Sequence, residues 1–597
     1  MARAAYLAPG VYVEEVPSAQ QPIAGVGTNT VGFIGVVEDP IYCPEPNPDY
    51  DPVLAQAALR LAELKAQASQ EAKPDAKARI QADIEAATRK LDQEIQNLQT
   101  VLTEQERNIP AQETARSVAQ NALTEAEKAL ADFQPDPNDS RQDATRKRRP
   151  LVANVEKATA DLGAASTKLS DLHAEIAAKR EELESLRAAK EGQTPAPSPQ
   201  PGAQPGTPDE SALLRESILK PYILKRFTVE LDPGVTVLCT NFSEYARRFG
   251  AFSADDPSSP GKALSPGHRA LTHAVYGFFK NGGTRCFVAR LKSDNAAEID
   301  RALTAMESID AIAIIAAPGL DGPIIWDKLV THCELCEDRF AILDCPADVG
   351  ANGDMDVTLL SYESANNLLP QRNKNASFYF PHIEVIDPAK QMQDEDPARG
   401  VPLKYRGRVY VSPTGHIAGI YARTDELRGV HKAPANAAVL GALNVKYYIG
   451  KPRQELLNPQ GVNCIRNMNG NINVWGARTI GGDKNSEWKY INVRRFFLFL
   501  RESIDEGTQW VVFEPNDPAL WGKIRRNVSA FLTNVWRTGA LFGLTPEEAF
   551  YVKCDAETNP PEVRDLGMVV TEIGVAIVRP AEFVIFRITQ STGPRTS

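Results

Sequence analysis

The sequence has few of the features that mark a secreted, membrane-spanning or nucleic-acid-binding protein. Its 597 residues contain 8 scattered cysteines, too few for a disulfide framework, which favours folding in a reducing, cytoplasmic compartment. The longest purely apolar run, Ala311–Ala317, is too short to cross a bilayer. The amino-terminal residues MARAAYLAPG lack the apolar core of a secretory signal. A net charge of -11 argues against a general nucleic-acid binder.

Motifs that carry catalysis or cofactor binding are also missing. There is no Walker loop, no HExxH and no GxSxG, and the Gly25–Gly27 turn does not match a dinucleotide-binding loop. Cys333 and Cys336 follow His332 at helical spacing, but no second Cys/His pair lies nearby to complete a tetrahedral metal site. We interpret both cysteines as small buried residues. The sequence therefore predicts no catalytic, cofactor-binding or metal-binding residues and no cofactor.

The length predicts about three to five domains, and composition separates residues 41–219 from the rest. This segment is rich in Ala, Glu, Lys, Gln and Leu, and Pro-rich stretches flank it. Its apolar spacing predicts three helices, roughly 74–110, 111–133 and 151–190, with breaks at Pro110 and Pro135–Pro137 and a heptad pattern in the third. We expect an inserted up-down-up coiled-coil bundle. The cluster Arg146–Arg149 is interpreted as a solvated loop before the third helix.

An insertion flanked by linkers requires its two ends to meet, so Val37 and Pro221 are expected to be neighbours. After it, strands alternate with helices up to about residue 395, which indicates a partly parallel, doubly wound α/β layer. The predicted strands are Val235–Cys239, Arg285–Leu291, Ala311–Ala317 and Phe340–Asp344, and the predicted helices are Ser243–Phe249, His268–Lys280 and Trp326–Glu337.

The carboxy-terminal block, 406–590, predicts a helix at Phe496–Ile504, a strand at Gln509–Phe513 and a helix opened by Asp517-Pro518. The last of these helices carries one apolar face: Leu520, Ile524, Val528, Phe531 and Val535. Thr545 and Glu548 have the spacing of a capping box. Further strands are expected at Phe550–Cys554 and Met568–Val578.

Both ends of the chain look like extended segments. The tail Arg579–Gln590 (RPAEFVIFRITQ) is apolar at alternate and intervening positions, which is typical of a strand buried on both faces. Pro580 suits the beginning of such a strand because it has no N–H to donate. The arm YLAPGVYVEEV is a shorter alternating segment near the start. Each strand either completes the chain's own sheet or is donated to a neighbour, and the residues alone leave both possibilities open.

Several stretches resemble contractile tail sheath proteins, the family found in contractile-tailed phages, phage-tail-like particles and extracellular contractile injection systems. They are the arm with PIAGVGTNTVGFIG, HAVYGFFKNGGTRCFVARL, SPTGHIAGIYARTDELRGVHKAPAN, LLNPQGVNCIR, YINVRRFFLFLRESI, QWVVFEPND and VRPAEFVIFRI. The resemblance covers roughly residues 1–40 and 220–590, whereas the helical insertion departs from it. One chain that carries both the arm and the carboxy-terminal block argues against a two-protein sheath of the type VI kind.

The resemblance implies an α/β (α+β mixed) multidomain subunit of a helical six-fold sheath around an inner tube. The implied divisions are an arm at 1–20, an assembly core from 21–40 and 400–580, the bundle at 41–219, an outer α/β domain at 220–399 and a tail strand at 581–597. Such subunits are linked by donated terminal strands, here Val11, Tyr12, Val13, Glu14 and Glu15 in the arm and Phe583, Val584, Ile585, Phe586, Arg587 and Ile588 in the tail. Glu14 and Glu15 are candidates to pair with Arg579 or Arg587 of neighbours, or to remain solvated.

The implied partners are further copies of the chain, an inner tube protein, and baseplate and terminal cap proteins, with neither nucleic acid nor direct membrane insertion. Assembly in the bacterial cytoplasm and release by lysis is expected, and we lean toward an injection system or phage-like particle over a phage. The rival interpretation, an α/β enzyme with a coiled-coil partner-binding arm, is disfavoured by the missing catalytic constellation.

Overall fold

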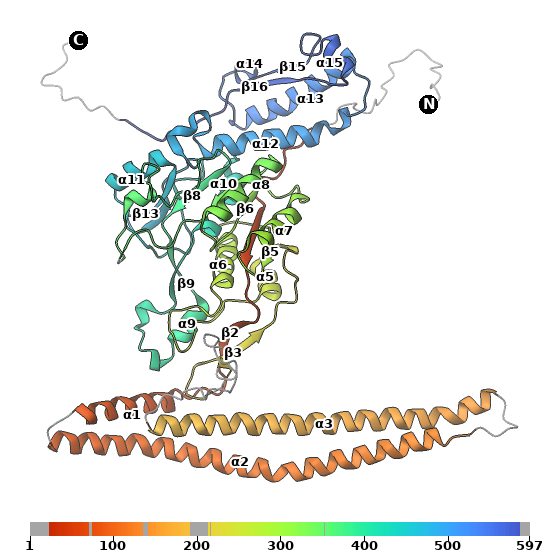
Figure 1. Ribbon diagram of the computed structural model, residues 1–597, viewed down its shortest axis with the longest axis vertical. Helices are drawn as coiled ribbons and strands as arrows, with labels where there is room; N and C mark the ends of the chain where they lie inside the picture. Colours follow the sequence, from red (N-terminus) through yellow and green to blue (C-terminus); the bar gives the residue numbers. More distant parts are fainter. Residues whose placement is uncertain are drawn as a thin grey trace, which may run out of the picture.

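The computed structural model describes residues 23–70, 74–134, 141–191, 213–214, 217–351 and 353–585. It confirms a mixed α/β, multidomain chain. A central sheet forms the body, a helical subdomain with a small hairpin lies at one end, and a long helical bundle lies across the opposite end (Figure 1). The predicted arm residues Val11, Tyr12, Val13, Glu14 and Glu15, and the tail residues Phe586, Arg587 and Ile588, lie outside the described residues. None of the helices described combines the length and the apolar character needed to cross a bilayer.

One nine-stranded sheet organises the body. Its order is β11 (Ala437–Ala438), β14 (Asn471–Val474), β13 (Val462–Met468), β8 (Ala376–Phe380), β7 (Phe340–Leu343), β6 (Ile314–Ala316), β1 (Val31–Val36), β5 (Cys286–Leu291) and β4 (Thr236–Cys239). The run from β13 to β5 is parallel, while β4, β14 and β11 are added antiparallel. The predicted division at 399/400 is therefore wrong, because β13 pairs with β8 and β1 lies between β5 and β6.

The strands are buried on both faces because helices cover both sides, as expected for a parallel sheet. In β1, Val31 and Phe33 belong to one buried cluster while Ile34 belongs to the other. On the first face lie α5 (Phe242–Phe249), α6 (Pro266–Lys280) and α10 (Thr414–Arg428); on the second lie α7 (Ala296–Glu307) and α8 (Pro323–Cys336). The strands and helices predicted between residues 235 and 344 are confirmed to within a few residues. Cys333 is fully buried, as predicted, and Cys336 is half-buried.

The insertion leaves the body through a two-stranded ladder, β2 (Ile41–Pro46) with β3 (Tyr222–Phe227). The two ends of the insertion therefore meet, as predicted, but the junction lies at Asn47 and Pro221, whose backbones are hydrogen-bonded at 3.0 Å. The bundle contains α1 (Pro52–Gln70), α2 (Pro74–Ala131) and α3 (Arg141–Glu191). Its core joins Leu54 and Leu61 of α1 to the predicted apolar positions of α2 and α3, among them Leu91, Leu98, Ile176 and Leu183.

Two predictions about the bundle are wrong. Pro110 does not break the second helix, because it is exposed to solvent within a continuous α2 and the loss of one N–H donor is tolerated there. The cluster Arg146–Arg149 lies within α3, not in a loop before it. Helix α1 was not predicted, because the Pro-rich residues just before it were interpreted as the start of a loop.

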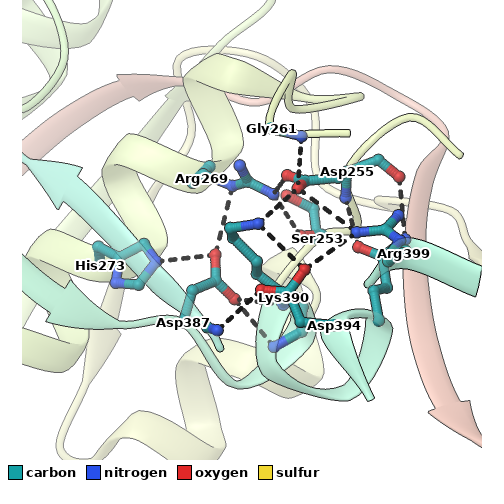
Figure 2. A network of polar contacts seen from close by, with 12 residues as sticks. Ser253, Asp255, Gly261, Arg269, His273, Asp387, Lys390, Asp394 and Arg399 are labelled. Carbon is teal, nitrogen blue, oxygen red and sulfur yellow. Dashed lines mark hydrogen bonds and ion pairs between the residues drawn. The ribbon is translucent and has the colours of Figure 1, made fainter. Parts of the chain in front are cut away.

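A buried charge network fastens the part of the body from which the insertion departs (Figure 2). Arg269 of α6 lies 2.7 Å from Asp255 and 3.3 Å from Asp387, which is the N-cap residue of α9 (Pro388–Asp394). Lys390 and Arg399 both reach Asp394, at 3.1 and 3.3 Å. The three carboxylates thus face three cations. The neighbouring Ala254 donates its N–H to the carbonyl of Tyr42 in β2, so the network lies against the root of the insertion.

The environment of Asp387 keeps it ionised. Burial alone raises the pKa of this carboxyl, but the hydrogen bond from His273 at 3.1 Å and the Arg269 charge outweigh burial and leave the pKa below its ordinary value. Asp387 also accepts the backbone N–H groups of Ala389 and Lys390. Removing any one member therefore leaves buried charges of the others without a partner.

The carboxyl ends of the parallel strands, where α/β sheets usually bind ligands, are filled by the chain's own carboxylates. Glu38, just after β1, accepts the N–H groups of Gly267 and His268 in the first turn of α6, both at 2.9 Å. Asp344, just after β7, accepts from the Ser412 and Thr414 hydroxyls and from the Gly319 N–H at 2.6 Å. The amino-terminal turns of α6 and α10, which attract phosphate in other folds, therefore already face an anion.

The smaller elements complete the chain. A three-stranded sheet contains β10 (Arg408–Val411), β9 (Ile383–Ile386) and β12 (Asn444–Val445). The last third adds α11 (Lys451–Leu457), α12 (Ile491–Thr508), α13 (Pro518–Arg537), α14 (Pro546–Ala549), β15 (Phe550–Lys553), α15 (Pro561–Asp565) and β16 (Glu572–Val575). The predicted apolar face of α13 is confirmed as buried, with Asp517 as its N-cap.

Three predictions in this part are wrong or only partly right. Gln509–Phe513 is not a strand, because α12 continues to Thr508 and a 3-10 turn at Gln509–Val511 packs its apolar side chains on the same core. Thr545 makes no capping hydrogen bond, because Glu548 instead accepts the N–H of Leu544 at 2.8 Å. The strand expected over Met568–Val578 is limited to β16.

The charge network predicts a large effect of Arg269→Ala. Removing the guanidinium leaves Asp255 and Asp387 buried without their shared cation, so the free energy of unfolding should fall by about 3–5 kcal/mol in urea denaturation. Arg60→Ala is the matched control, because Arg60 pairs with Glu63 on the surface and should cost less than about 0.5 kcal/mol. Equal, small losses for both variants would show that the network does not hold the base of the insertion.

Asp344 predicts a pH dependence of stability. Burial raises the pKa of Asp344 to about 6, despite the hydrogen bonds that Ser412, Thr414 and Gly319 donate. A raised folded pKa means that this carboxyl stabilises the fold most below its unfolded pKa of about 4 and loses the effect as the pH rises through 6. Asp344→Asn should remove that decline. The stability difference between variant and parent should change by about 2–3 kcal/mol between pH 4 and pH 7, and a difference independent of pH would contradict the assignment.

Candidate assembly interface

The small antiparallel hairpin formed by β15 and β16 has an unpaired edge. Ala576 donates its N–H to Ala549 and accepts from Phe542, so Ala576 faces the β15 side of the hairpin. Because antiparallel strands alternate in the direction of their backbone groups, Ile573, Val575 and Ile577 direct their N–H and C=O groups to the other side. These groups make no hydrogen bond to another described residue. Such an edge is a template for one further strand.

The hairpin is rigidly supported. The side chains of Phe550, Val552, Ile573 and Val575 pack against the core that α13 forms with α12. The same subdomain exposes several large apolar side chains, a feature that marks protein interaction surfaces. Their exposed fractions are 103% for Phe513, 90% for Leu544, 74% for Leu566, 73% for Phe542 and 59% for Tyr551.

The tail leaves the body at Glu582, which is held by an unusually complete set of donors. Arg478 donates from Nε and a terminal nitrogen to the two carboxylate oxygens, each at 2.8 Å. Asn458 donates at 2.8 Å and the Tyr490 hydroxyl at 2.9 Å. Burial raises the pKa of Glu582, but these hydrogen bonds outweigh it and leave the pKa below the ordinary value. We name Glu582, Arg478, Asn458 and Tyr490 the tail clamp.

Beyond the clamp the chain leaves its own surface. Phe583, Val584 and Ile585 are 70%, 68% and 80% exposed, and none of the three belongs to a strand. These are the described members of the tail strand predicted from sequence. Three consecutive large apolar residues are solvated here although the sequence pattern predicts burial. The described part of the chain therefore offers them no sheet.

The amino-terminal segment approaches from the other end of α12. Ile23, the first described residue, packs against Gly507, and the Val26 N–H donates to Ser503 at 3.1 Å. Thr28 accepts through its carbonyl from Arg495, which also forms a buried two-point pair with Asp425 at 3.0 and 2.6 Å. Because Tyr490 of the tail clamp immediately precedes α12, the two roots are about 26 Å apart along one helix.

The tail residues were predicted from the sequence as a donated strand, which stays a prediction, and the tail clamp was not predicted. Glu582 stands as a single acidic residue in an otherwise apolar run, and this was the available signal. Arg478 lies 104 positions away and is 3% exposed, so nothing local indicated the pairing. No described group of three or more His, Cys, Asp or Glu side chains is placed to hold a metal ion.

The tail clamp predicts different consequences for neighbouring substitutions. Glu582→Ala leaves the buried Arg478 with Asp483, 3.1 Å away, as its one remaining carboxylate partner among the described residues, so the free energy of unfolding should fall by about 2–3 kcal/mol. Phe583→Ala should change monomer stability by less than about 0.5 kcal/mol because its side chain is exposed, yet reduce assembly. Urea denaturation of the unassembled chains measures the first difference. A destabilising Phe583→Ala would mean that the tail packs on its own chain.

Two segments of the chain match known protein families. Residues 294–480 match the phage tail sheath protein central domain, and residues 483–591 match the phage tail sheath C-terminal domain. The tail sheath protein of Vibrio phage KVP40 is 27% identical over 187 residues, which is 31% of this chain and 26% of that protein. The tail sheath protein of Enterobacteria phage T4 is 21% identical over 229 residues, which is 38% of this chain and 32% of that protein. The chain thus spans about a quarter to a third of these relatives.

Among solved structures, the PVC sheath complex of an extracellular contractile injection system, in its contracted state, is 25% identical. It has a TM-score of 0.49 and covers 61% of this chain and 88% of its own. The baseplate of the anti-feeding prophage contains a chain that is 28% identical, with a TM-score of 0.48 and coverage of 61% and 91%. On the two domain matches and the tail sheath relatives, the chain belongs to the contractile tail sheath protein family.

Proposed function

We propose that the chain is a structural subunit of a contractile sheath that polymerises as stacked helical rings around an inner tube. In this proposal, contraction from a metastable extended state drives the tube through a target envelope. The observation that carries it is the combination of a solvated apolar tail, rooted in the tail clamp, with an unpaired edge on β16. The tail is a strand candidate without a sheet, and β16 is a sheet edge without a neighbouring strand.

The link between subunits is β-strand addition. The tail of one copy supplies backbone donors and acceptors, and the outward groups of Ile573, Val575 and Ile577 in another copy receive them. About five main-chain hydrogen bonds at roughly 1 kcal/mol each contribute several kcal/mol before side-chain burial is added. A head-to-tail contact of this kind extends without closing, as a helical filament requires. The arm residues Val11 to Glu15 provide the second link.

The clamp and α12 fit the mechanical requirement of such a mesh. Subunits that swing during contraction have to keep their links while the direction of pull changes. Glu582 passes tension on the tail to Arg478, and α12 connects that point to the root of the arm. Through Tyr490, which immediately precedes α12, part of the load reaches that helix.

The remaining partners follow from this role. The inner tube protein, the baseplate and terminal cap proteins are the expected contacts, and assembly occurs in the bacterial cytoplasm before release by lysis. The bundle lies at the end of the molecule opposite α12 and α13 (Figure 1). If the carboxy-terminal subdomain contacts neighbours and the tube, the bundle points to the outer surface of the sheath.

Truncation of the tail tests the proposal. Deleting residues 583–597 leaves the tail clamp in place, so the free energy of unfolding should stay within about 0.5 kcal/mol of the parent. Striated tubes should be lost in negative-stain electron microscopy because the donated strand is gone. Deleting only residues 591–597 removes the polar end, keeps the strand and should preserve the tubes. Full-length tubes from the larger deletion would overturn strand donation by the tail.

A further inference from the structure

The distal half of the bundle is a two-helix hairpin, unlike the half near the body. Close to the body, α1 completes a three-helix core. In addition, Arg180 pairs with Glu106 and Lys190 with Asp92, so α2 and α3 are joined by ion pairs there. Beyond Glu106, no ion pair joins α2 to α3 among the residues that the structure describes. Glu125 and Lys157 of this outer half, in particular, form no ion pair with another described residue.

One face of the hairpin carries a groove of ≈ 470 Å³ between the two helices. Small residues of α2, including Ala115 and Ala122, form one wall, and Asn154, Lys157 and Asp161 of α3 form the other. Val118 also lines the groove and is 62% exposed. Small side chains permit helices to approach closely, so the shape of the groove suits a helix.

Charges on this face follow a matched order. On α2, Arg107 is followed after about five helical turns by Glu125, and Asp132 directly follows the last residue of the helix. On α3, counted in the opposite direction, Glu175 is followed after about five turns by Lys157 and after three more by Arg146. Outward from the body, the three charges of the first series are positive, negative and negative. The three charges of the second series are negative, positive and positive, so the two series are opposite in sign at each step. Glu125, Asp132, Lys157 and Arg146 are all exposed.

The two series also lie at the same levels along the hairpin. Gln105 donates to Glu175 at 3.1 Å, which sets the antiparallel alignment of α2 and α3. Counting outward by equal lengths from that contact, Glu125 lies level with residue 155 and Asp132 with residue 148, each within two residues of its oppositely charged counterpart, Lys157 or Arg146. Glu125 and Lys157 nevertheless form no ion pair within the described chain, because they stand on opposite rims of the groove.

We propose that the outer halves of two bundles, from two copies of this chain, pack groove to groove and point the same way as a four-helix bundle. This arrangement places α2 of one copy on α3 of the other at equal height, as a two-fold contact requires. Glu125 then faces Lys157, Asp132 faces Arg146 and Arg107 faces Glu175 of the second copy. In the antiparallel alternative α2 lies on α2 with the heights reversed, so the contact between Glu125 and Lys157 of the second copy is lost.

The available surface is large enough for a specific contact. The hairpin beyond Glu106 is about 40 Å long and two helices, about 20 Å, wide, giving roughly 800 Å² per partner, the size of a standard interface. Alanine-lined faces contribute less apolar burial than leucine-lined ones, so the contact is weak between free chains. It is strengthened when many copies are tethered in one assembly.

Cysteine crosslinking between co-expressed full-length chains tests the inference. One chain carries Ala122→Cys, and a second, distinguished by an affinity tag, carries Asp161→Cys; a short bismaleimide links thiols that come close. The expected result is a heterodimer well above the background of chains that contain only native cysteines. The matched control replaces Ala122→Cys by Glu127→Cys, which helical periodicity places on the far side of α2. Its yield should remain at background.

Charge reversal provides the second arm. Glu125→Lys in both chains should lower the crosslinked fraction about two- to tenfold, and adding Lys157→Glu should restore it. Circular dichroism verifies that all variants keep their helix content. Absence of the heterodimer in chains of unchanged helicity, equal yield from the Glu127→Cys control, or crosslinking of the Ala122→Cys chain to a different protein would each overturn the inference. The tail truncation leaves this contact untouched, so the two proposals fail separately.

Discussion

Backbone hydrogen bonding imposes the central constraint: strand groups shielded from water need partners, and the described carboxy-terminal part of this chain does not supply them. The outward groups of β16 make no bond to the rest of the described chain, and Phe583 to Ile585 are solvated although apolar. A monomer tolerates both conditions because water solvates them. In the proposed assembly that water is removed, and the edge and the tail would each be satisfied by a strand from another copy.

The body of the molecule gives the proposed link a fixed origin. Arg478 and Tyr490 anchor the tail at one end of α12, while Gly507 and Ser503 hold the amino-terminal segment near the other. Since α12 also contributes Leu498 to the core of the sheet and Phe496 to that of the carboxy-terminal subdomain, it connects both parts. At the opposite end, the charge network around Arg269 fastens the root of the bundle, which leaves the body as a separate structural unit.

Local patterns in the sequence predicted the elements better than their connections. The Asp517-Pro518 start and the one-sided apolar spacing were sufficient to predict α13 and its buried face, because both signals act within a few helical turns. The same logic failed at Gln509–Val511, where packing on the core that α12 and α13 build selects a helical turn for a segment whose apolar residues favour strands. The pairing of β8 with β13 depends on contacts about 85 positions apart, so no local pattern revealed that the sheet crosses the expected domain boundary. The tail strand was predicted from its composition and stays a prediction, whereas the tail clamp was not predicted, since its partners come together only in the folded chain.

The central claim is that the tail of one copy pairs with β16 of another. A helical cryo-electron microscopy reconstruction of the assembled particle tests it directly. The account predicts density for residues 583–590 as a strand hydrogen-bonded to Ile573, Val575 and Ile577 of a neighbouring subunit, continuous with Glu582 in its clamp. Density that returns the tail to its own chain, or leaves the β16 edge of every subunit unpaired, would contradict it.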